Sequence, residues 1–317
     1  TRDIISEEFQ WKKNNYIIID TPGLRKKSKI SDELEKKSSE THWTSEANEL
    51  ARMNWWTIEY GLIGDLNNPK IYGAGLLSSV SESLDCLDKK VKKIPISIEC
   101  IHQDYNITEP QPQLYVANNF KDLIKLLDDY SKTMGFKTGG KDGVKKAIRS
   151  ENITTAVYDS GLQISGIIKN YINDNNGEIT YLSYDKNVQL SYGINEIPNH
   201  GIDYHSTGYG AAIGKLSKYE KPIHQLNKNQ LNSLGIKNNS QVSLEFIGGL
   251  TLTGLIKKIV EHEGKPIIIT MENTNVKIMG NHLFKPEWGT YDLACGGEIA
   301  SVFGGPADWN KYYKKSL

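Results

Sequence analysis

Residues 45–62 constrain the fold of this chain more than any other stretch, because two adjacent tryptophans lie within an apolar pattern of helical period. Ser45 follows Thr44 as a plausible N-cap, and acidic residues in the first turn suit the unpaired N–H groups there. The apolar positions recur at three- and four-residue steps: Ala47, Leu50, Ala51, Trp55, Ile58 and Leu62. The pattern predicts an amphipathic helix that ends near Gly61.

Glu59 is the candidate ligand of this helix, because it lies one turn beyond Trp55 and Trp56. A carboxylate that is held among aromatic rings has lost water, so it must be protonated, paired or bound to a cation. The alternative is a glutamate at a helix end whose oxygens reach solvent.

Length and charge bound the remaining possibilities. The chain has 317 residues, which is long enough for two or three domains. Its 38 basic and 38 acidic side chains balance, so the charge gives no reason to expect binding to nucleic acid or to an anionic membrane. No apolar run approaches a membrane span and no signal peptide opens the chain. Three widely separated cysteines favour reduced thiols in a cytoplasm. A first residue other than methionine indicates a fragment.

The segment 1–37 reads as a β-hairpin: Phe9–Trp11, a polar turn, then Tyr16–Asp20. The letters TRD at the start, and DTPGLRKKSKI after the hairpin, resemble the switch region of tandem-domain GTPases of ribosome assembly. That resemblance implies that Asp20 helps to hold Mg²⁺ and that Gly23 senses a γ-phosphate. The GxxxxGK[ST] loop and an NKxD motif are absent, so we expect an inert fragment, with GTP binding as an alternative function.

Three motifs carry a second resemblance, over residues 41–135: NWWTIEYGLIG from Asn54, IYGAGLLSSVSESLDCL from Ile71, and YNITEPQPQLYVANNF from Tyr105. Together they resemble the pterin-dependent aromatic amino acid hydroxylases, the phenylalanine hydroxylase family. Residues 150–317 are similar to the extension of longer bacterial members. We place a junction between the two resemblances near residues 35–41.

The hydroxylase resemblance implies that Fe(II), tetrahydropterin and O₂ together add a hydroxyl to an aromatic amino acid, as in phenylalanine 4-monooxygenases. Glu59 would be the carboxylate of a two-histidine, one-carboxylate iron site. Trp55, Gly75, Ser78 and Glu82 would line the substrate pocket, and Ser78 would also support the metal. The pterin side would carry Ala51 and Asn54, although better-known members have tyrosine in place of Asn54.

One departure from the family bears on catalysis. The family's two iron histidines precede this helix in a His-Glu-x-x-x-His element, but residues 1–41 contain no histidine, and His42 stands alone. We therefore expect a catalytically incomplete site that binds Fe(II) weakly. The preferred amino acid and the oligomeric state stay open.

The expected fold class is mixed. We expect the hairpin fragment 1–37, a mainly helical partial hydroxylase domain 38–135, a glycine-rich linker 136–150, and a β-rich accessory domain 151–317. In the last of these, His200 and His205 have metal-ligand spacing. The glycines around them, Gly201, Gly208 and Gly210, favour a solvated loop. A third alternative function is a non-catalytic accessory protein built from this tail.

Overall fold

The computed structural model describes residues 5–11, 14–20, 44–107 and 109–314, and the chain divides into two compact units, Thr1–Glu49 and Leu50–Leu317. In the first unit, strands β1 (Ile5–Trp11) and β2 (Asn14–Asp20) pair antiparallel. This confirms the predicted hairpin. Gly23 and His42 lie outside the described residues, so the predictions that concern them stay predictions.

The tryptophan-bearing helix begins as predicted but ends differently. Helix α2 covers Glu46–Asn54, and the Asn48 N–H donates to Ser45 Oγ at 3.2 Å, which confirms the N-cap. The next turn, η1 (Trp55–Glu59), is a π-helix, closed by the Tyr60 N–H donating to the Trp55 carbonyl at 2.9 Å. The expected single α-helix is therefore wrong from Trp55 onward. A π-turn adds one residue to the turn and changes the direction in which the following side chains point.

A four-stranded sheet follows the helix, in the order β4-β3-β6-β5. Strand β3 pairs antiparallel with β4 and parallel with β6, where Leu62 lies opposite Val116. The strands of this part are β3 (Leu62–Asp65), β4 (Asn68–Ile71), β5 (Lys92–Pro95) and β6 (Gln113–Ala117). Its further helices are α3 (Ala74–Ser78), α4 (Val80–Asp85), the 3₁₀-helix η2 (Ile98–His102) and α5 (Phe120–Ser131).

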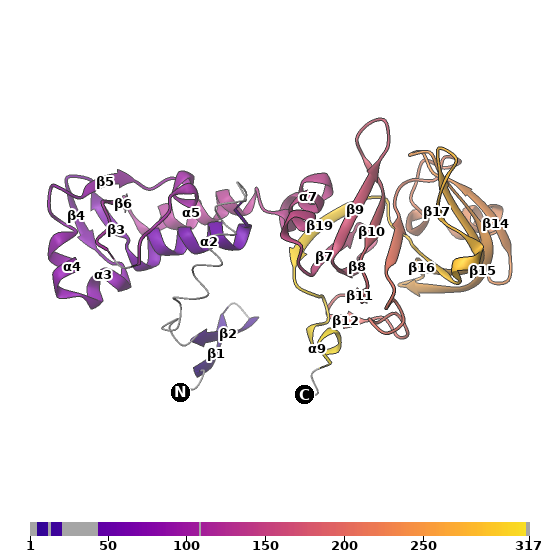
Figure 1. Cartoon of the computed structure of the whole chain (residues 1–317), viewed down its shortest axis with the longest axis horizontal. Helices are drawn as coiled ribbons and strands as arrows, with labels where there is room; N and C mark the ends of the chain where they lie inside the picture. Colours follow the sequence, from indigo (N-terminus) through magenta and orange to yellow (C-terminus); the bar gives the residue numbers. More distant parts are fainter. Residues whose placement is uncertain (1–4, 12–13, 21–43, 108, 315–317) are drawn as a thin grey trace. The chain divides into compact units, whose positions relative to one another are not determined.

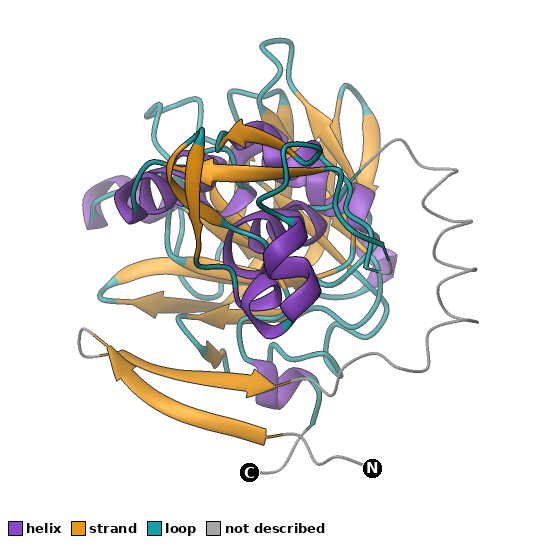
Figure 2. Cartoon of the chain, turned by 90° about the vertical axis from the view of Figure 1, so that its left-hand side faces the viewer, coloured by secondary structure: helices purple, strands orange, loops and turns teal. Residues whose placement is uncertain are grey.

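The expectation of a mainly helical domain over residues 38–135 is wrong, because this sheet lies among the helices. Figure 2 looks onto this part of the chain and shows orange strands between purple helices. The strands are only four or five residues long, and β3 and β6 are far apart in the sequence. Runs this short show little periodicity, and their pairing is non-local, so local patterns underestimate them.

One apolar cluster holds the sheet and helices of this part together. Trp56 is 1% exposed and Leu62 is 0% exposed, and the Trp56 indole N–H donates to the Gln103 carbonyl at 2.9 Å. The cluster also contains Cys100, Leu114 and other buried side chains from β6 and α5. The second tryptophan therefore forms the centre of the core.

The expected linker 136–150 is wrong, because this stretch forms helices α6 (Gly135–Thr138) and α7 (Gly140–Ser150). Val144 and Ala147 of α7 are buried in the same cluster as the neighbouring strands. Gly139 has a φ of +53°, and a Cβ there would lie 2.5 Å from the carbonyl of Ala300. The glycine thus permits a tight turn and close packing.

Residues 151–317 form three sheets, which confirms the predicted β-rich character (Figure 1). The first has the order β12-β11-β8-β7-β19, the second β13-β10-β9, and the third β14-β15-β16-β17, with β18 also paired to β16. The strands of the first two sheets are β7 (Thr154–Tyr158), β8 (Leu162–Gly166), β9 (Ile168–Asn173), β10 (Ile179–Tyr184), β11 (Gln189–Tyr192), β12 (Asn195–Glu196), β13 (Tyr209–Ala212) and β19 (Ile299–Gly304). The third contains β14 (Gln241–Glu245), β15 (Leu250–His262), β16 (Lys265–Ile278), β17 (Asn281–Phe284) and β18 (Tyr291–Ala294). The helices here are η3 (Ile223–Gln225), α8 (Lys228–Ser233), η4 (Pro286–Trp288) and α9 (Trp309–Tyr312).

The cysteines and the lengths of the helices can also be compared with what the sequence predicts. All three cysteines are buried free thiols, as expected. Among the described helices, none combines the length and the apolar character that crossing a membrane requires.

We predict that Leu62→Ala destabilises the four-stranded part by about 2–5 kcal/mol, because it removes a fully buried side chain and leaves a cavity. Urea unfolding followed by tryptophan fluorescence measures the change. The control is Leu84→Ala on α4, where the side chain is 71% exposed and the expected change is within about 0.5 kcal/mol. Equal effects of the two substitutions would contradict this core assignment.

Candidate functional site

Glu59 is the last residue of the π-helix and is half-buried against the loop that opens α3. A Cβ at Gly73 would lie 2.5 Å from the Glu59 carbonyl oxygen, and a Cβ at Gly75 would lie 3.3 Å from Glu59 Oε2. The Gly73 N–H donates to the Gly61 carbonyl at 3.0 Å. Two glycines therefore let the backbone of this loop approach the candidate ligand closely, and the structure brings Glu59 and Gly75 together. The roles predicted for them stay predictions.

An aromatic stack lies beside Glu59. The Trp55 ring stacks on Tyr60 with centroids 4.6 Å apart, and on Tyr105 with centroids 4.2 Å apart. The Trp55 indole nitrogen is buried, yet it finds no hydrogen-bond acceptor among the described residues. The stack thus combines flat apolar surface with one unused donor. Sequence reasoning assigned no role to Tyr60 or Tyr105, although Tyr60 adjoins Glu59 and Tyr105 opens the third motif.

Glu82 belongs to the same group of side chains. Tyr60 donates its hydroxyl hydrogen to Glu82 Oε1 at 3.1 Å. Burial, this hydrogen bond, and the charges of Glu82 and Glu59, in that order, raise the pKa of Tyr60 to about 12. A cavity of about 20 Å³ beside Tyr60 and Glu82 is large enough for a water molecule, but not for an amino acid.

Two serines follow Gly75 and act locally. Ser78 is exposed, and its hydroxyl donates to the Gly75 carbonyl at 2.8 Å. Ser79 caps α4 by accepting from the Glu82 N–H at 3.3 Å. Ser78 therefore supports the glycine loop that touches Glu59, and its expected role beside a metal stays a prediction.

The residues that were expected on the pterin side lie on the helix turn before Trp55. Ala51 and Asn54 are exposed on α2. Among the described residues, no hydrogen bond or ring contact joins either of them to Glu59. At the other candidate site, Asp20 is the last residue of β2, and the structure does not test the GTPase resemblance.

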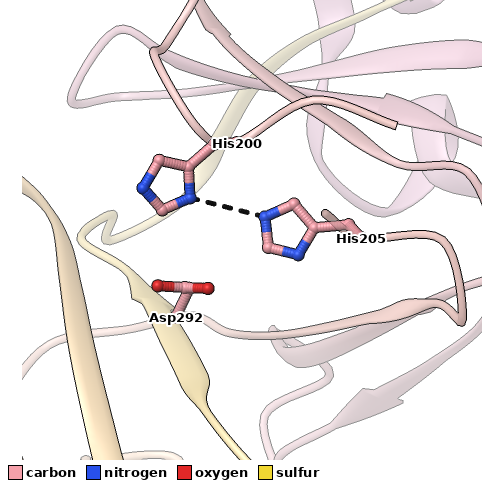
Figure 3. Close-up of side chains that lie close together, drawn as sticks. All are labelled: His200, His205 and Asp292. Carbon is pink, nitrogen blue, oxygen red and sulfur yellow. Dashed lines mark hydrogen bonds between the residues drawn. The ribbon is translucent and has the colours of Figure 1, made fainter. Parts of the chain in front are cut away.

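The expectation of a solvated loop at His200 and His205 is wrong, since the two side chains are only 4% and 6% exposed. His200 Nδ1 lies 3.4 Å from His205 Nε2, and the buried Asp292 carboxylate lies beside both rings (Figure 3). Burial lowers the pKa of both histidines, that of His205 to about 3 with a further contribution from His200. Asp292 was missed because it is remote in sequence and no local motif marks it.

Within the part of the chain that the structure describes, this trio is the one group of three histidine, cysteine or acidic residues close enough to hold a metal ion together. Glu59 is not part of such a group. The described surroundings of Glu59 therefore supply a single carboxylate ligand.

The central part of the chain is similar to known proteins. Residues 28–139 match the family model described as biopterin-dependent aromatic amino acid hydroxylase. Phenylalanine-4-hydroxylase of Bos taurus is 42% identical over 86 residues, which cover 27% of this chain and 19% of that protein. Phenylalanine-4-hydroxylase of Chromobacterium violaceum is 40% identical over 76 residues, covering 23% and 26%. The chain thus spans under a third of the length of these relatives.

The chain is also similar to a solved structure over part of its length. The C. violaceum phenylalanine hydroxylase with bound iron(III) and 7,8-dihydrobiopterin is 34% identical. The alignment covers 28% of this chain and 34% of that one, with a TM-score of 0.25.

We predict that Glu82→Gln lowers the pKa of Tyr60 from about 12 toward 10, because an amide removes the charge that opposes the phenolate. Since the folded pKa is the higher one, the stabilisation from neutral Tyr60 is complete below pH 10 and is lost as the pH rises to about 12. Carbon-13 NMR titration of labelled tyrosine measures the shift, with Tyr60→Phe assigning the signal. The exposed Glu99→Gln serves as the control and should leave this titration unchanged.

Proposed function

We propose that residues 28–139, which match the biopterin-dependent aromatic amino acid hydroxylases, supply the carboxylate side of an iron- and pterin-dependent site that hydroxylates an aromatic amino acid. The observation that carries the proposal is the position of Glu59. It ends a π-helix, a local geometry that is frequent at functional sites, and it lies against a loop whose glycines permit close contact.

The substrate class follows from the aromatic stack. Trp55 presents a flat ring between Tyr60 and Tyr105, and stacked or edge contacts with a further ring are favourable. Phenylalanine is the first substrate to test, because the relatives are phenylalanine-4-hydroxylases. Gly75, Ser78 and Glu82 complete the proposed substrate side, and Glu82 acts there through its hydrogen bond with Tyr60.

The residues fit the proposed cofactors only in part. Iron with tetrahydropterin would supply the activation of O₂. Glu59 offers one oxygen ligand of the three that a two-histidine, one-carboxylate site requires. Among the described residues no histidine joins Glu59 in a ligand group, so we derive no catalytic step through the metal. The exposed Ala51 and Asn54 remain the proposed pterin side.

We predict that joining the upstream histidine-bearing segment of a relative at about Thr41 yields a chain that hydroxylates phenylalanine in the presence of Fe(II) and tetrahydropterin. In that chimera, Glu59→Gln should lower turnover by orders of magnitude, because an amide removes the ligand's charge. Ser78→Ala should lower it roughly 10–100-fold through the glycine loop. Tyrosine formation measured by chromatography gives the rates.

The exposed Glu99→Gln is the matched control for the chimera and should retain full turnover. If the chimera binds iron and turns over normally with Glu59→Gln, then Glu59 is not the carboxylate ligand and the proposal for this helix fails.

For the chain itself we predict that Glu59→Gln leaves the Fe(II) affinity unchanged, because one carboxylate without partner ligands contributes little to binding. Calorimetric titration of both proteins under anaerobic conditions measures this. A clear loss of Fe(II) affinity in the variant would show that Glu59 already has partner ligands in this chain.

A further inference from the structure

The buried trio His200, His205 and Asp292 lies in the C-terminal β-rich part and is independent of the proposed hydroxylase site. Each residue offers one ligand atom, and these atoms all lie within 4.8 Å of one another. Figure 3 shows the two imidazole rings facing each other and the Asp292 carboxylate beside them. Three donors that converge in this way on one buried position are rare unless they bind something there.

The turn that carries the two histidines is fixed by its backbone. The Leu190 N–H donates to the His200 carbonyl at 2.9 Å, and the Val188 N–H donates to the His205 carbonyl at 3.2 Å. Within the turn, the His205 N–H donates to the Gly201 carbonyl at 3.1 Å. Both histidines are therefore attached to the chain beside β11, and their rings face each other without needing a bound group to hold them.

The carboxylate comes from a different sheet and is equally fixed. Asp292 lies in β18, opposite Thr270 of β16, and Thr270 Oγ1 donates to Asp292 Oδ1 at 2.6 Å. The Tyr209 hydroxyl donates to the Asp292 backbone carbonyl at 2.6 Å. A hydroxyl that holds a carboxylate in this way is the arrangement usually found around the ligands of protein metal sites.

Charge favours a cation at this position. Asp292 is 3% exposed, and none of the salt bridges formed by the described residues includes it. Its neighbours are the Thr270 hydroxyl and the two imidazole rings. A buried carboxylate that lacks a salt-bridge partner beside two imidazole nitrogens suits a bound cation.

We propose that His200, His205 and Asp292 form a binding site for a divalent transition-metal ion, with zinc as the preferred ion. Two nitrogens bound to a tetrahedral zinc ion at about 2.0–2.1 Å lie about 3.3–3.4 Å apart, and the two facing nitrogens here are 3.4 Å apart. Two imidazoles with one carboxylate suit zinc, whereas Ca²⁺ and Mg²⁺ prefer oxygen ligands only. Three protein ligands leave the fourth zinc position for water or another group.

The metal would join two parts of the C-terminal fold. The histidine turn follows β12 and is hydrogen-bonded to β11 of one sheet, and Asp292 belongs to a strand paired with β16 of another. A bound ion would thus stabilise the contact between these elements, and stability would depend on its concentration.

The test uses the full chain, freed of metal with a chelator and then titrated with Zn²⁺ against a chromophoric competitor. We expect one equivalent to bind with micromolar or tighter affinity and to raise the melting temperature. Co²⁺ in place of Zn²⁺ should give the intense visible absorption of a four-coordinate site. The exposed Glu99→Gln, which belongs to neither site, should bind Zn²⁺ like the unmodified chain.

Three substitutions locate the site. His205→Asn and Asp292→Asn should each abolish tight Zn²⁺ binding and the rise in melting temperature. Thr270→Val keeps the shape of the side chain but removes the hydroxyl donor to Asp292, and it should weaken Zn²⁺ binding roughly 10–100-fold. His224→Asn is the matched control, because His224 is also buried and lies 3.7 Å from the carboxylate of Asp159, outside any described group of three ligands.

The proposal is overturned if the unmodified chain binds Zn²⁺ no more tightly than Asp292→Asn, or if Thr270→Val binds it unchanged. In either case, the contact between the two histidines is only a buried hydrogen bond. If His205→Asn does not fold, the two nearly isosteric variants Asp292→Asn and Thr270→Val decide the question alone.

Discussion

The close approach of the Gly73–Gly75 loop to the end of the π-helix is the contact on which the first candidate site depends. A side chain at Gly73 would meet the Glu59 backbone at 2.5 Å, and one at Gly61 would meet the Thr57 carbonyl at 2.0 Å. Neither distance is sterically possible, so glycine at these positions sets where Glu59 lies. The ring stack around Trp55 and the Tyr60–Glu82 hydrogen bond then surround the carboxylate. The geometry of the site therefore originates in the backbone.

The chain carries two arrangements of potential metal ligands, and they differ in burial. Glu59 is half-buried at the end of a helix, without partner ligands among the described residues. His200, His205 and Asp292 are almost fully buried and converge from two sheets. Burial removes water as a binding partner, so the polar side chains of the second group need a partner inside the protein far more than Glu59 does. This difference is why the structure supports a metal site in the tail more directly than at the helix.

Local sequence patterns predicted those helices and strands in which apolar residues recur at a regular spacing. The hairpin of β1 and β2 and the first part of the tryptophan-bearing helix lie close to the expected positions, because the apolar residues of each recur with the period of that element. The prediction of a linker over residues 136–150 was wrong because packing against distant residues decides the structure there. Its glycines are typical of a hinge, but Gly139 packs against Ala300, and Val144 lies in a core that includes strands distant in sequence. Glycine alone does not distinguish a flexible segment from close packing.

Three motifs in fixed order were enough to predict the hydroxylase resemblance of the central segment, which the family-model match supports, and to single out Glu59 as a candidate ligand. The sequence also determined the β-rich character of the tail. The apolar pattern did not reveal the π-turn that ends at Glu59. Tertiary contacts fixed the aromatic stack that joins Trp55 to Tyr105 and the meeting of Asp292 with the two histidines. The stack and the trio join residues far apart in the chain, and no local pattern encodes such contacts.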